Sequence, residues 1–407
     1  MAILVKKFGG SSVATPEKMH GIVDRVLNEK KPGDRVVLVV SAMGDSTDDL
    51  LELASKVAPN MPKRELDMLL STGEQVSVAL MAGAFISKGQ PAISFTGGQA
   101  GILTSDVHTK ATILNVDAKR VKEALEEGKV VIVAGFQGVT GAGDITTLGR
   151  GGSDTTAVAV AAGIRADFCE IYTDVDGVYT ADPRIAPGAK KMEEITFAEM
   201  LELARLGAGV MQPRAVEYGE HNGVAIHVRS TFKETSGTII REECTVQEKN
   251  FVIRGVAHDT NVAKIAVKGV PDQPGVAYKI FSALAAASVD VDMIIQSFRD
   301  ADGTNDILFT VVKTDLVEAT SVVESLKEKM GGFTFDVEIN VAKVSIVGAG
   351  MLGSPGIAAG MFGALADAGI NIAAISTSEI SISCLIKASD VKEAVNAIHK
   401  HFFEASE

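Results

Sequence analysis

The chain has 407 residues, of which 46% are hydrophobic and 22% charged, and this predicts a soluble protein of two or three domains. Its formal net charge of −13 argues against nucleic-acid binding through a broad basic face. Cys169, Cys244 and Cys384 form neither a metal-ligand spacing nor a disulfide framework, which favours a reducing cytoplasm. Neither a membrane span nor export is expected, because no apolar run or N-terminal pattern indicates one.

The first candidate site follows a short apolar strand pattern at residues 2–5. The loop after it carries Lys7, two glycines (Gly9 and Gly10) and two hydroxyls, the first from Ser11. Glycine lets the backbone approach a ligand closely, and free N–H groups, hydroxyls and a lysine all suit phosphate oxygens. We predict a phosphate-binding loop, although the Walker A pattern is absent. Lys6 should point to the opposite face of the strand from Lys7, and we expect it to be solvated.

Up to about residue 240, apolar strand-like runs alternate with helical patterns. The predicted strands are 2–5, 35–40, 92–95, 130–134, 168–173 and 224–227, and the predicted helices are 17–28, 63–88, 111–127, 155–162, 197–206 and 213–221. This alternation predicts a mainly parallel sheet covered by helices on both faces. Ligands of such sheets bind beyond the carboxyl ends of the strands, where the glycine-rich segments fall. The polar segment 234–249 is interpreted as an interdomain link.

An internal repeat follows the link. Residues 262–267 match residues 341–346, and the pair Pro274-Gly275 matches Pro355-Gly356. Each copy has the pattern strand, helix, strand, strand, helix, strand, which predicts two ferredoxin-like βαββαβ modules. The G-x-G-x-x-G pattern at residues 348–353 is not interpreted as a dinucleotide site, because a small module of this kind lacks the doubly wound sheet.

The strongest local motif is Leu148-Gly149-Arg150-Gly151-Gly152-Ser153-Asp154. The planar guanidinium of Arg150 suits a carboxylate, and Ser153 or Asp154 can cap the helix that follows. An ordinary glycine turn is the less favoured interpretation, because an arginine, paired glycines and a helix start coincide here.

Two further motifs are ambiguous by themselves. Glu74, in Ser71-Thr72-Gly73-Glu74, is either a surface glutamate after a glycine or a partner for a substrate ammonium group. Residues 172–184 are rich in Asp, Tyr and Arg, so they form either two plain turns or contacts to ribose, Mg²⁺ or phosphate. The seven histidines show no metalloprotease or triad pattern.

Taken together and in this order, the four motifs resemble those of bacterial aspartate kinases. The resemblance covers the whole chain and implies an α/β fold. The expected architecture is a three-layer αβα sandwich of the amino acid kinase type with a mainly parallel sheet, residues 1–245, followed by two ACT domains, 246–335 and 336–407. It implies ATP-dependent phosphorylation of the L-aspartate side-chain carboxylate to 4-phospho-L-aspartate, the first step toward lysine, threonine and methionine. Mg²⁺ is expected to be held mostly by nucleotide oxygens, with no protein metal site.

The resemblance also implies roles for single residues. Lys7 and Asp154 are the expected catalytic residues, Asp154 orienting Lys7. The expected aspartate pocket comprises Ser41, Thr47, Glu74 for the ammonium group, Arg150 for the α-carboxylate, Gly151, Gly152 and Ser153. The expected ATP contacts are Lys7, Gly9, Gly10, Ser11, Thr173, Asp174, Tyr179, Arg184, Gly209 and Val210. Because an aspartate side chain has a reference pKa of about 3.9, it is already ionised and needs no general base.

The chain departs from the family pattern in two places of the segment 206–213. Gly209 stands where many relatives have a lysine, and Gln212 replaces a common histidine. A lysine side-chain contact to the nucleotide is therefore lost, while a backbone contact from Gly209 or Val210 is still expected.

The ACT repeats imply feedback inhibition by lysine and/or threonine and assembly into a dimer or larger homo-oligomer. The expected effector residues are Asp272, Gly275, Val276, Ala277 and Gln296 in the first copy and Asn371 and Ile372 in the second. Ala358 stands where some threonine-responsive relatives have a hydroxyl. Two alternatives stay open: repeats that only dimerise, and a catalytically inactive regulator that binds amino acids, against which the intact Lys7, Glu74, Arg150 and Asp154 argue.

Overall fold

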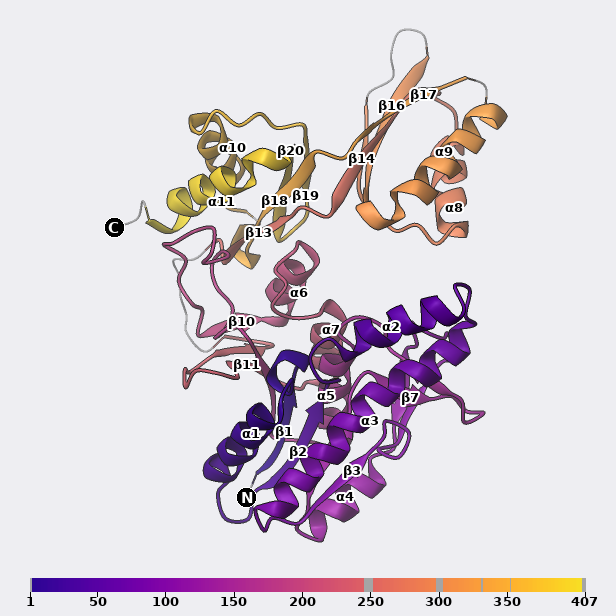
Figure 1. Ribbon diagram of the computed structural model, residues 1–407. Coiled ribbons are helices and arrows are strands. Elements are labelled where there is room, and N and C mark those ends of the chain that lie inside the picture. The colour runs from indigo at the N-terminus through magenta and orange to yellow at the C-terminus, as the bar shows by residue number, and fades with distance from the viewer. Residues whose placement is uncertain (1, 245–251, 298–302, 331, 352, 405–407) are drawn as a thin grey trace. The chain divides into compact units, whose positions relative to one another are not determined.

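The computed structural model describes residues 2–244, 252–297, 303–330, 332–351 and 353–404 (Figure 1). The chain divides into two compact units, each described by itself. Unit 1 comprises Met1–Val178, Lys191–Ala204 and Gly209–Gln247, and unit 2 comprises Tyr179–Lys190, Arg205–Ala208 and Glu248–Glu407. The domain boundaries at residues 245 and 335 stay a prediction.

An eight-stranded sheet forms the centre of unit 1, with the order β10-β12-β11-β9-β1-β2-β6-β3 among the described residues. Its strands are β1 (Ile3–Phe8), β2 (Arg35–Val40), β3 (Ala92–Phe95), β6 (Val130–Ala134), β9 (Phe168–Thr173), β10 (Glu194–Thr196), β11 (Ile226–Ser230) and β12 (Thr238–Arg241). All neighbours are parallel except β11 and β12. The predicted mainly parallel sheet is confirmed, and its carboxyl edge is where a ligand site is expected.

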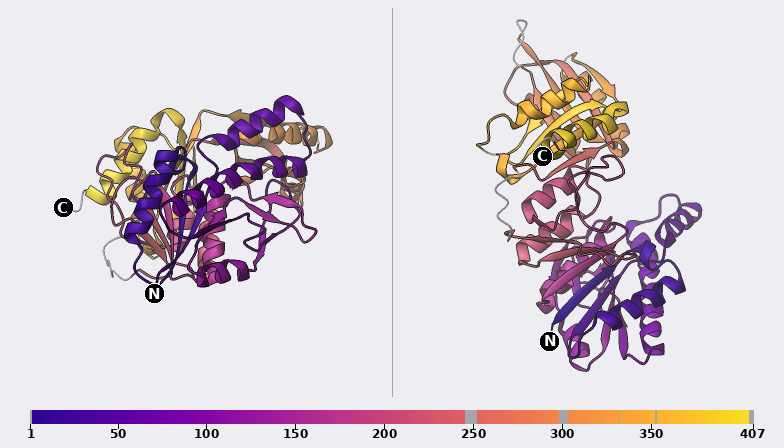
Figure 2. Two further views of the ribbon diagram at one scale, coloured as in Figure 1. Left: turned by 60° about the horizontal axis from the view of Figure 1, so that its bottom comes forward. Right: turned by 90° about the vertical axis from the view of Figure 1, so that its left-hand side faces the viewer.

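Helices cover both faces of this sheet, as the right-hand view of Figure 2 shows. The helices of unit 1 are α1 (Pro16–Glu29), α2 (Ser46–Val57), α3 (Lys63–Ser87), α4 (Lys119–Glu126), α5 (Gly152–Ile164), α6 (Phe197–Arg205) and α7 (Pro213–Asn222). α1 and α3 share one core with Phe8 and Tyr172 of the sheet. α5 packs on the other face of β1, the face of Lys7. The αβα sandwich therefore has a buried sheet with a different helix pair on each side.

A second, smaller sheet lies in unit 1, with the order β5-β4-β7-β8. It consists of β4 (Ile102–Thr104), β5 (Ile113–Val116), β7 (Gln137–Val139) and β8 (Ile145–Thr147). β8 packs against α3, and it leads directly into the Arg150 motif. The small sheet thus connects α3 to that motif.

Two local predictions in this unit are wrong. The first half of the helix predicted over 111–127 is the strand β5, and only α4 is helical. The segment 234–249 is not simply a link, because β12 pairs with both β10 and β11. Residues 245–249 of that segment lie outside the described residues. The conformation of a short strand depends on the strands that it pairs with. The hydrophobic pattern of its own residues therefore does not predict it.

Unit 2 contains both repeats. The first copy has β14 (Val262–Pro271), α8 (Val276–Ala286), β15 (Val291–Gln296), β16 (Thr304–Val312), α9 (Leu316–Met330) and β17 (Thr334–Glu338), in the sheet order β15-β16-β14-β17. The second has β18 (Val341–Val347), α10 (Ile357–Asp367), β19 (Ala374–Thr377), β20 (Ser381–Lys387) and α11 (Val391–His399). The predicted βαββαβ order holds throughout the first copy.

The second copy departs from the predicted order in its last strand. Its sheet, β13-β18-β20-β19, is completed by β13 (Gly255–Asp259), which precedes the first copy in the chain. β13 pairs antiparallel with β18, whose side chains are all buried. The glycines at 348 and 350 pack against the backbone at Val252, so close packing inside unit 2 accounts for them.

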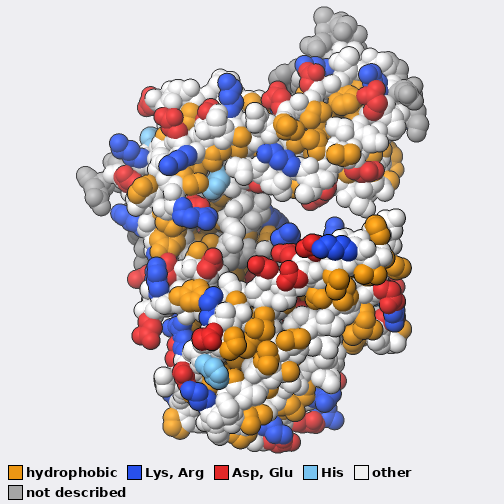
Figure 3. Space-filling model, in the orientation of Figure 1, with side chains coloured by type: hydrophobic (Ala, Val, Ile, Leu, Met, Phe, Trp, Pro, Cys, Tyr) orange, Lys and Arg blue, Asp and Glu red, His pale blue; other side chains and the backbone are white. Residues whose placement is uncertain are grey.

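The surface of the molecule and the longest helix bear on partners. On the face in Figure 3, acidic and basic side chains intermix and no broad basic patch forms. Among the described helices, α3 alone is long and apolar enough to cross a membrane, and half of its apolar window is buried inside the protein. That burial is typical of a core helix.

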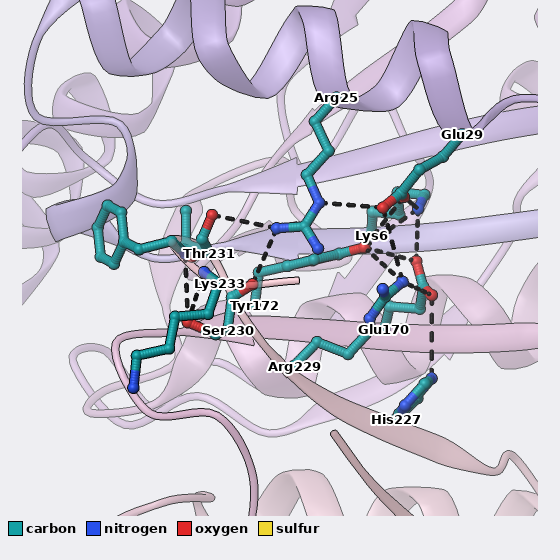
Figure 4. A network of polar contacts seen from close by, with 11 residues as sticks. Lys6, Arg25, Glu29, Glu170, Tyr172, His227, Arg229, Ser230, Thr231 and Lys233 are labelled. Carbon is teal, nitrogen blue, oxygen red and sulfur yellow. Dashed lines mark hydrogen bonds and ion pairs between the residues drawn. The ribbon is translucent and has the colours of Figure 1, made fainter. Parts of the chain in front are cut away.

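A buried ion cluster lies on the α1 side of β1, which makes the prediction of a solvated Lys6 wrong (Figure 4). Lys6 is 3% exposed, and its Nζ lies 2.6 Å from Glu29 Oε2 and 2.6 Å from Glu170 Oε2. Arg229 NH1 lies 3.0 Å from Glu170 Oε1, and Arg25 Nε donates to Glu29 Oε1 at 3.0 Å. The cluster joins α1, β1, β9 and β11, because Lys6 pairs with Glu29 of α1 and Glu170 of β9, and Arg229 of β11 pairs with Glu170.

The cluster also sets the pKa values of its carboxyl groups. Burial alone would raise the pKa of Glu29, but the hydrogen bonds and charges of Lys6 and Arg25 outweigh it and lower that pKa from 4.5 to about 2. The pKa of Glu170 is also lowered, because Lys6 and Arg229 outweigh the effect of burial. Carboxyl groups with a depressed folded-state pKa stabilise the fold above their unfolded pKa, and this stabilisation is lost as the pH falls.

We therefore predict that Lys6→Met lowers the free energy of unfolding at neutral pH by about 3 kcal/mol, because it leaves buried carboxylates short of a cation. Lys88→Met, which removes only the exposed pair with Asp24, should cost less than about 1 kcal/mol. Urea unfolding followed by circular dichroism measures both. In the wild type the same measurement should show stability falling as the pH drops from 4.5 toward 2. Equal costs for the two variants would contradict the structural role of Lys6.

Candidate active site

A pocket of about 770 Å³ opens at the carboxyl edge of the central sheet in unit 1. Eleven of the predicted site residues line it: Lys7, Gly9, Gly10, Ser41, Thr47, Glu74, Arg150, Gly151, Gly152, Ser153 and Asp154. They come from the ends of β1 and β2, the starts of α2 and α5, and the middle of α3. The structure thus brings the phosphate loop, the Glu74 motif and the Arg150 motif into one pocket.

Glu74 lies inside α3 and is 3% exposed. Its Oε1 accepts a hydrogen bond from Ala42 N at 3.1 Å, whereas its Oε2 is buried without a hydrogen-bond partner in the described structure. Burial raises the pKa of Glu74 to about 7, although the Ala42 N–H group opposes the shift. A buried carboxylate oxygen without a partner costs free energy, and a cationic ligand group in the pocket would recover it.

Lys7 reaches Asp154 on the other face of β1 from Lys6. Its Nζ lies 2.5 Å from Asp154 Oδ1, and both side chains are 12% exposed. The next residues form a tight loop, in which Gly44 N donates to Gly10 O at 3.1 Å and a Cβ on Gly10 would lie 3.0 Å from the Ala42 and Gly44 oxygens. The loop therefore holds the Lys7 ammonium beside a glycine backbone that a ligand can approach closely, as a phosphate site requires.

The amino end of α5 faces the same pocket. Gly151, with φ of 69°, adopts the left-handed conformation before the helix, and Gly152 begins it. Residues 151–154 all line the pocket, so the positive end of the helix dipole points toward a bound anion. Arg150 is exposed, and its guanidinium has no partner among the residues that the structure describes. It is free to form a two-point contact with a carboxylate.

Residues predicted to contact the nucleotide divide between two places. Thr173 ends β9 and Asp174 follows it; because Tyr172 of β9 is the register partner of Phe8, both residues lie beside the Gly9 loop. Thr173 O accepts from Thr231 N at 2.9 Å, and Ser12 Oγ lies 2.7 Å from Thr231 Oγ1. These contacts continue the carboxyl edge of the sheet from the phosphate loop toward β11.

The other predicted nucleotide residues do not line this pocket. Ser11 is exposed, and its carbonyl accepts from Lys18 Nζ at 2.8 Å. Tyr179 and Arg184 belong to unit 2, where Arg184 NH2 lies 2.8 Å from Asp182 Oδ2. Gly209 and Val210 precede α7 in unit 1, with open space around the Gly209 Cα.

Gln212, one of the departures from the family pattern, packs directly against the Arg150 motif. A Cβ on Gly151 would lie 1.8 Å from Gln212 Cγ, so a side chain at position 151 is excluded. The segment before α7 therefore reaches the pocket through Gln212, and Gly209 lies three residues away from that contact. The positive φ of Gly151 and this close approach both require glycine there.

The predicted effector residues all lie in unit 2. Gly275 precedes α8 with φ of 94°, and Gly356 precedes α10 at the matching place with φ of 98°. Val276 and Ala277 begin α8, and Asp272 Oδ1 accepts from Asn305 Nδ2 at 3.3 Å. Gln296 ends β15 and is exposed, as is Asn371, while Ile372 is partly exposed.

Sequence reasoning missed several residues of the pocket wall. Asp48, Leu51, Thr109, Lys110, Phe136 and Thr147 also line it. Asp48 could have been predicted from the sequence, because Ser46 followed by acidic residues is typical of a helix start, and α2 begins there. Lys110 gives no such signal, because its loop joins the pocket only through folding of the small sheet. Among the described residues, no three His, Cys, Asp or Glu side chains gather as a metal site.

Comparison with known proteins places this geometry in a family. The profile of the Amino acid kinase family matches residues 2–230, and that of the ACT domain matches residues 265–326 and 344–402. An aspartokinase of Mycolicibacterium smegmatis is 50% identical over 405 residues, covering 99% of this chain and 96% of the relative. One of Bacillus sp. (strain MGA3) is 49% identical over 402 residues, covering 99% and 97%.

Solved structures agree with the sequence relatives. E. coli aspartokinase III in complex with aspartate and ADP (R-state) matches with a TM-score of 0.84 at 26% identity, over 98% of this chain and 100% of that one. The same enzyme in complex with lysine and aspartate (T-state) matches with a TM-score of 0.77, over 98% and 99%. The mainly parallel sheet and the two repeats thus have counterparts along nearly the whole chain, which belongs to the aspartokinases of the amino acid kinase family.

Proposed function

We propose that this chain transfers the γ-phosphoryl group of ATP to the side-chain carboxylate of L-aspartate. This assignment rests on two groups of opposite charge that line one pocket and have no partner for that charge in the described part of the chain. Glu74 Oε2 is a buried anion without a partner, and the Arg150 guanidinium is a cation without one among the described residues. An α-amino acid brings an ammonium and a carboxylate on one carbon, and it satisfies both groups at once.

The chain's own residues supply the rest of the chemistry. An oxygen of the aspartate side chain attacks the γ-phosphorus, a new P–O bond forms, and the bond to the bridging oxygen of ADP breaks. No proton moves, because the attacking carboxylate is already ionised. Lys7, held by Asp154, and the amino end of α5 offset the negative charge that gathers as the two anions meet.

Mg²⁺ fits this site as a companion of the nucleotide. The described residues offer no cluster of three ligands, while isolated carboxylates, Asp48 and Asp154, line the pocket. When bound, Mg²⁺ would neutralise phosphate oxygens, with the nucleotide and water as most of its ligands. Thr173, Asp174, Tyr179, Arg184 and the backbone at Gly209 and Val210 are proposed for the nucleotide, and Ser41, Thr47 and Ser153 for aspartate.

Regulation is assigned to unit 2. Lysine and/or threonine would bind near the amino ends of α8 and α10, where the matching glycines adopt the same left-handed conformation. An effector inhibits only if it binds one state of the protein more tightly than the other. Assembly into a homo-oligomer through the ACT repeats and a cytoplasmic location complete the proposal.

The activity is tested by ADP release with ATP, Mg²⁺ and a panel of acceptors: L-aspartate, L-glutamate, N-acetyl-L-glutamate and UMP. Aspartate alone should support turnover. Lys7→Met should lower kcat about 100-fold or more, because it removes a cation from the reacting phosphoryl group. Lys31→Met, which changes an exposed lysine, is the matched control. Turnover with another acceptor and none with aspartate would refute the assignment, and full activity of Lys7→Met would refute the role of Lys7.

The role of Glu74 predicts a pH dependence. The pKa of Glu74 is raised to about 7, so the carboxyl is neutral below this pH and anionic above it. Because the ammonium group needs the anion, the Kd of aspartate should fall as the pH rises from 6 to 8. Calorimetric titration at several pH values measures this. In Glu74→Gln the Kd should be raised and this part of the pH dependence lost; an unchanged profile would contradict the proposal.

The effector site is tested by titrating lysine and threonine, singly and together, against aspartate turnover. Asp272→Ala should raise the half-inhibiting concentration about 10-fold or more, since it removes an anion near the effector's ammonium group, and the uninhibited kcat should stay unchanged. Glu318→Ala, an exposed change on α9, is the control. Inhibition that is unaltered in Asp272→Ala would remove that residue from the site. No inhibition by either amino acid in the wild type would favour repeats that only dimerise.

A further inference from the structure

The wall of the pocket that includes Arg150 is made of two loop segments. Thr109 and Lys110 belong to the segment between β4 and β5, and Thr147 and Gly149 belong to a second segment, which begins at the last residue of β8 and leads into α5. Loops of this kind are mobile unless something fixes them. The position of Arg150 depends on both segments, because a Cβ on Gly149 would lie 3.2 Å from the Thr109 carbonyl oxygen.

A single buried carboxylate joins the two segments. Asp67, on α3, is fully buried. Thr109 N donates to its two oxygens at 3.1 and 3.0 Å, and Thr147 Oγ1 donates to Oδ1 at 2.5 Å. His108 Nδ1 lies 2.8 Å from Oδ2, within hydrogen-bond distance. Each segment therefore donates to Asp67.

The conformation of Thr109 shows what this contact holds. Its φ of 70° lies in the left-handed region, which β-branched residues rarely adopt. Such a backbone persists where the surroundings fix it, and it is common near functional sites. Here the surroundings are the Asp67 carboxylate and, across the pocket wall, Gly149.

A second set of hydrogen bonds, from Arg214, also joins the two segments. Arg214 of α7 donates to Leu148 O at 2.6 Å and to Ala111 O at 2.9 Å. Ala111 N also donates to Thr147 O at 3.0 Å. The two segments are thus bonded to each other, to Arg214 on one side and to Asp67 on the other. Asp67 does not itself line the pocket.

Asp67 and Glu74 are seven residues apart on α3, which places them two turns apart on the same helix face. We propose that Asp67 is a positioning residue for the amino-acid substrate: through Thr109 and Thr147 it fixes Arg150 relative to Glu74. One helix then sets the distance between the two groups that bind aspartate, Glu74 directly and Arg150 through Asp67. This proposal rests on the proposed function, since it assigns the substrate's two ends to those groups.

The first test is Asp67→Asn, which keeps the size of the side chain but replaces one acceptor with a donor. The KM for aspartate should rise about 10-fold or more, because a misplaced Arg150 weakens substrate binding, while the KM for ATP should change less than about 2-fold. Asp67→Glu should recover part of the loss. A fall in kcat alone, with both KM values unchanged, would show a merely structural role and overturn the proposal.

Two neighbouring threonines provide a matched pair of variants. Thr147→Val removes one donor to Asp67, whereas Thr146→Val removes a buried hydroxyl on the same strand whose partner is Thr104. Only Thr147→Val should raise the KM for aspartate. The double variant Asp67→Asn/Thr147→Val should then be no worse than Asp67→Asn, because both changes break one contact. Fully additive effects, or equal effects of the two threonines, would contradict the proposal.

A readout without turnover separates this proposal from the assigned activity. Amide hydrogen exchange of Thr109 should be at least about 10-fold faster in Asp67→Asn than in the wild type, since its N–H loses one of the two oxygens that accept from it. If the wild type does not phosphorylate aspartate, the proposed function fails, and this exchange still tests whether Asp67 holds Thr109 in place. If aspartate is phosphorylated but exchange at Thr109 is unchanged in the variant, the positioning role of Asp67 is contradicted and the proposed function stands.

Discussion

Burying a charge requires a partner, and this constraint separates the parts of unit 1 that build the fold from the part that binds. Lys6 has two carboxylates within 2.6 Å, and Asp67 is hydrogen-bonded to three residues. These charges are satisfied inside the protein, so they hold elements together. Glu74 Oε2 is buried without a hydrogen-bond partner, and among the described residues Arg150 has none either. The unmet charges lie in one pocket, and a ligand with the opposite charges completes them.

The central strand shows how a short sequence serves both purposes. Side chains alternate along a strand, so Lys6 and Lys7 face opposite layers of the sandwich. Lys6 meets α1 and β9 in the buried cluster, and Lys7 meets Asp154 at the start of α5. Two identical neighbours therefore have different tasks. The cluster fixes β1 in the sheet, and this fixes the loop that presents Lys7 to a phosphoryl group. The reaction needs that cation more than it needs a base, because its nucleophile is already an anion.

The sequence predicts the fold well where hydrophobic runs are long. Strands such as β2 and β6 have the predicted bounds, and the Gly9 loop, Ser41 and Asp174 lie at one edge because the parallel strands β1, β2 and β9 end there. The prediction from sequence fails where contacts between residues far apart in the chain determine the structure. Alternation places Lys6 on the correct face, but the burial of that face by α1 and the pairing of Lys6 with Glu29 and Glu170 are tertiary contacts that alternation does not predict. The sequence of β5 predicts a helix, but this segment is a strand that pairs with β4. β13 belongs to the sheet of the second repeat although it precedes the first repeat in the chain. Asp67 and Lys110 carry no motif, since their relation to the pocket arises from tertiary contacts alone.

The central claim is that Glu74 Oε2, a buried carboxylate oxygen without a hydrogen-bond partner among the described residues, binds the ammonium group of the substrate. The most direct measurement is a carbon-13 NMR titration of the Glu74 carboxyl, with Glu74→Gln used to assign the signal. In the free protein it should titrate near pH 7, the value to which burial raises its pKa. Saturating aspartate should move that pKa well below its free value, because an adjacent cation favours the ionised form. A Glu74 that is ionised throughout the range, or whose titration aspartate leaves unchanged, would contradict the account.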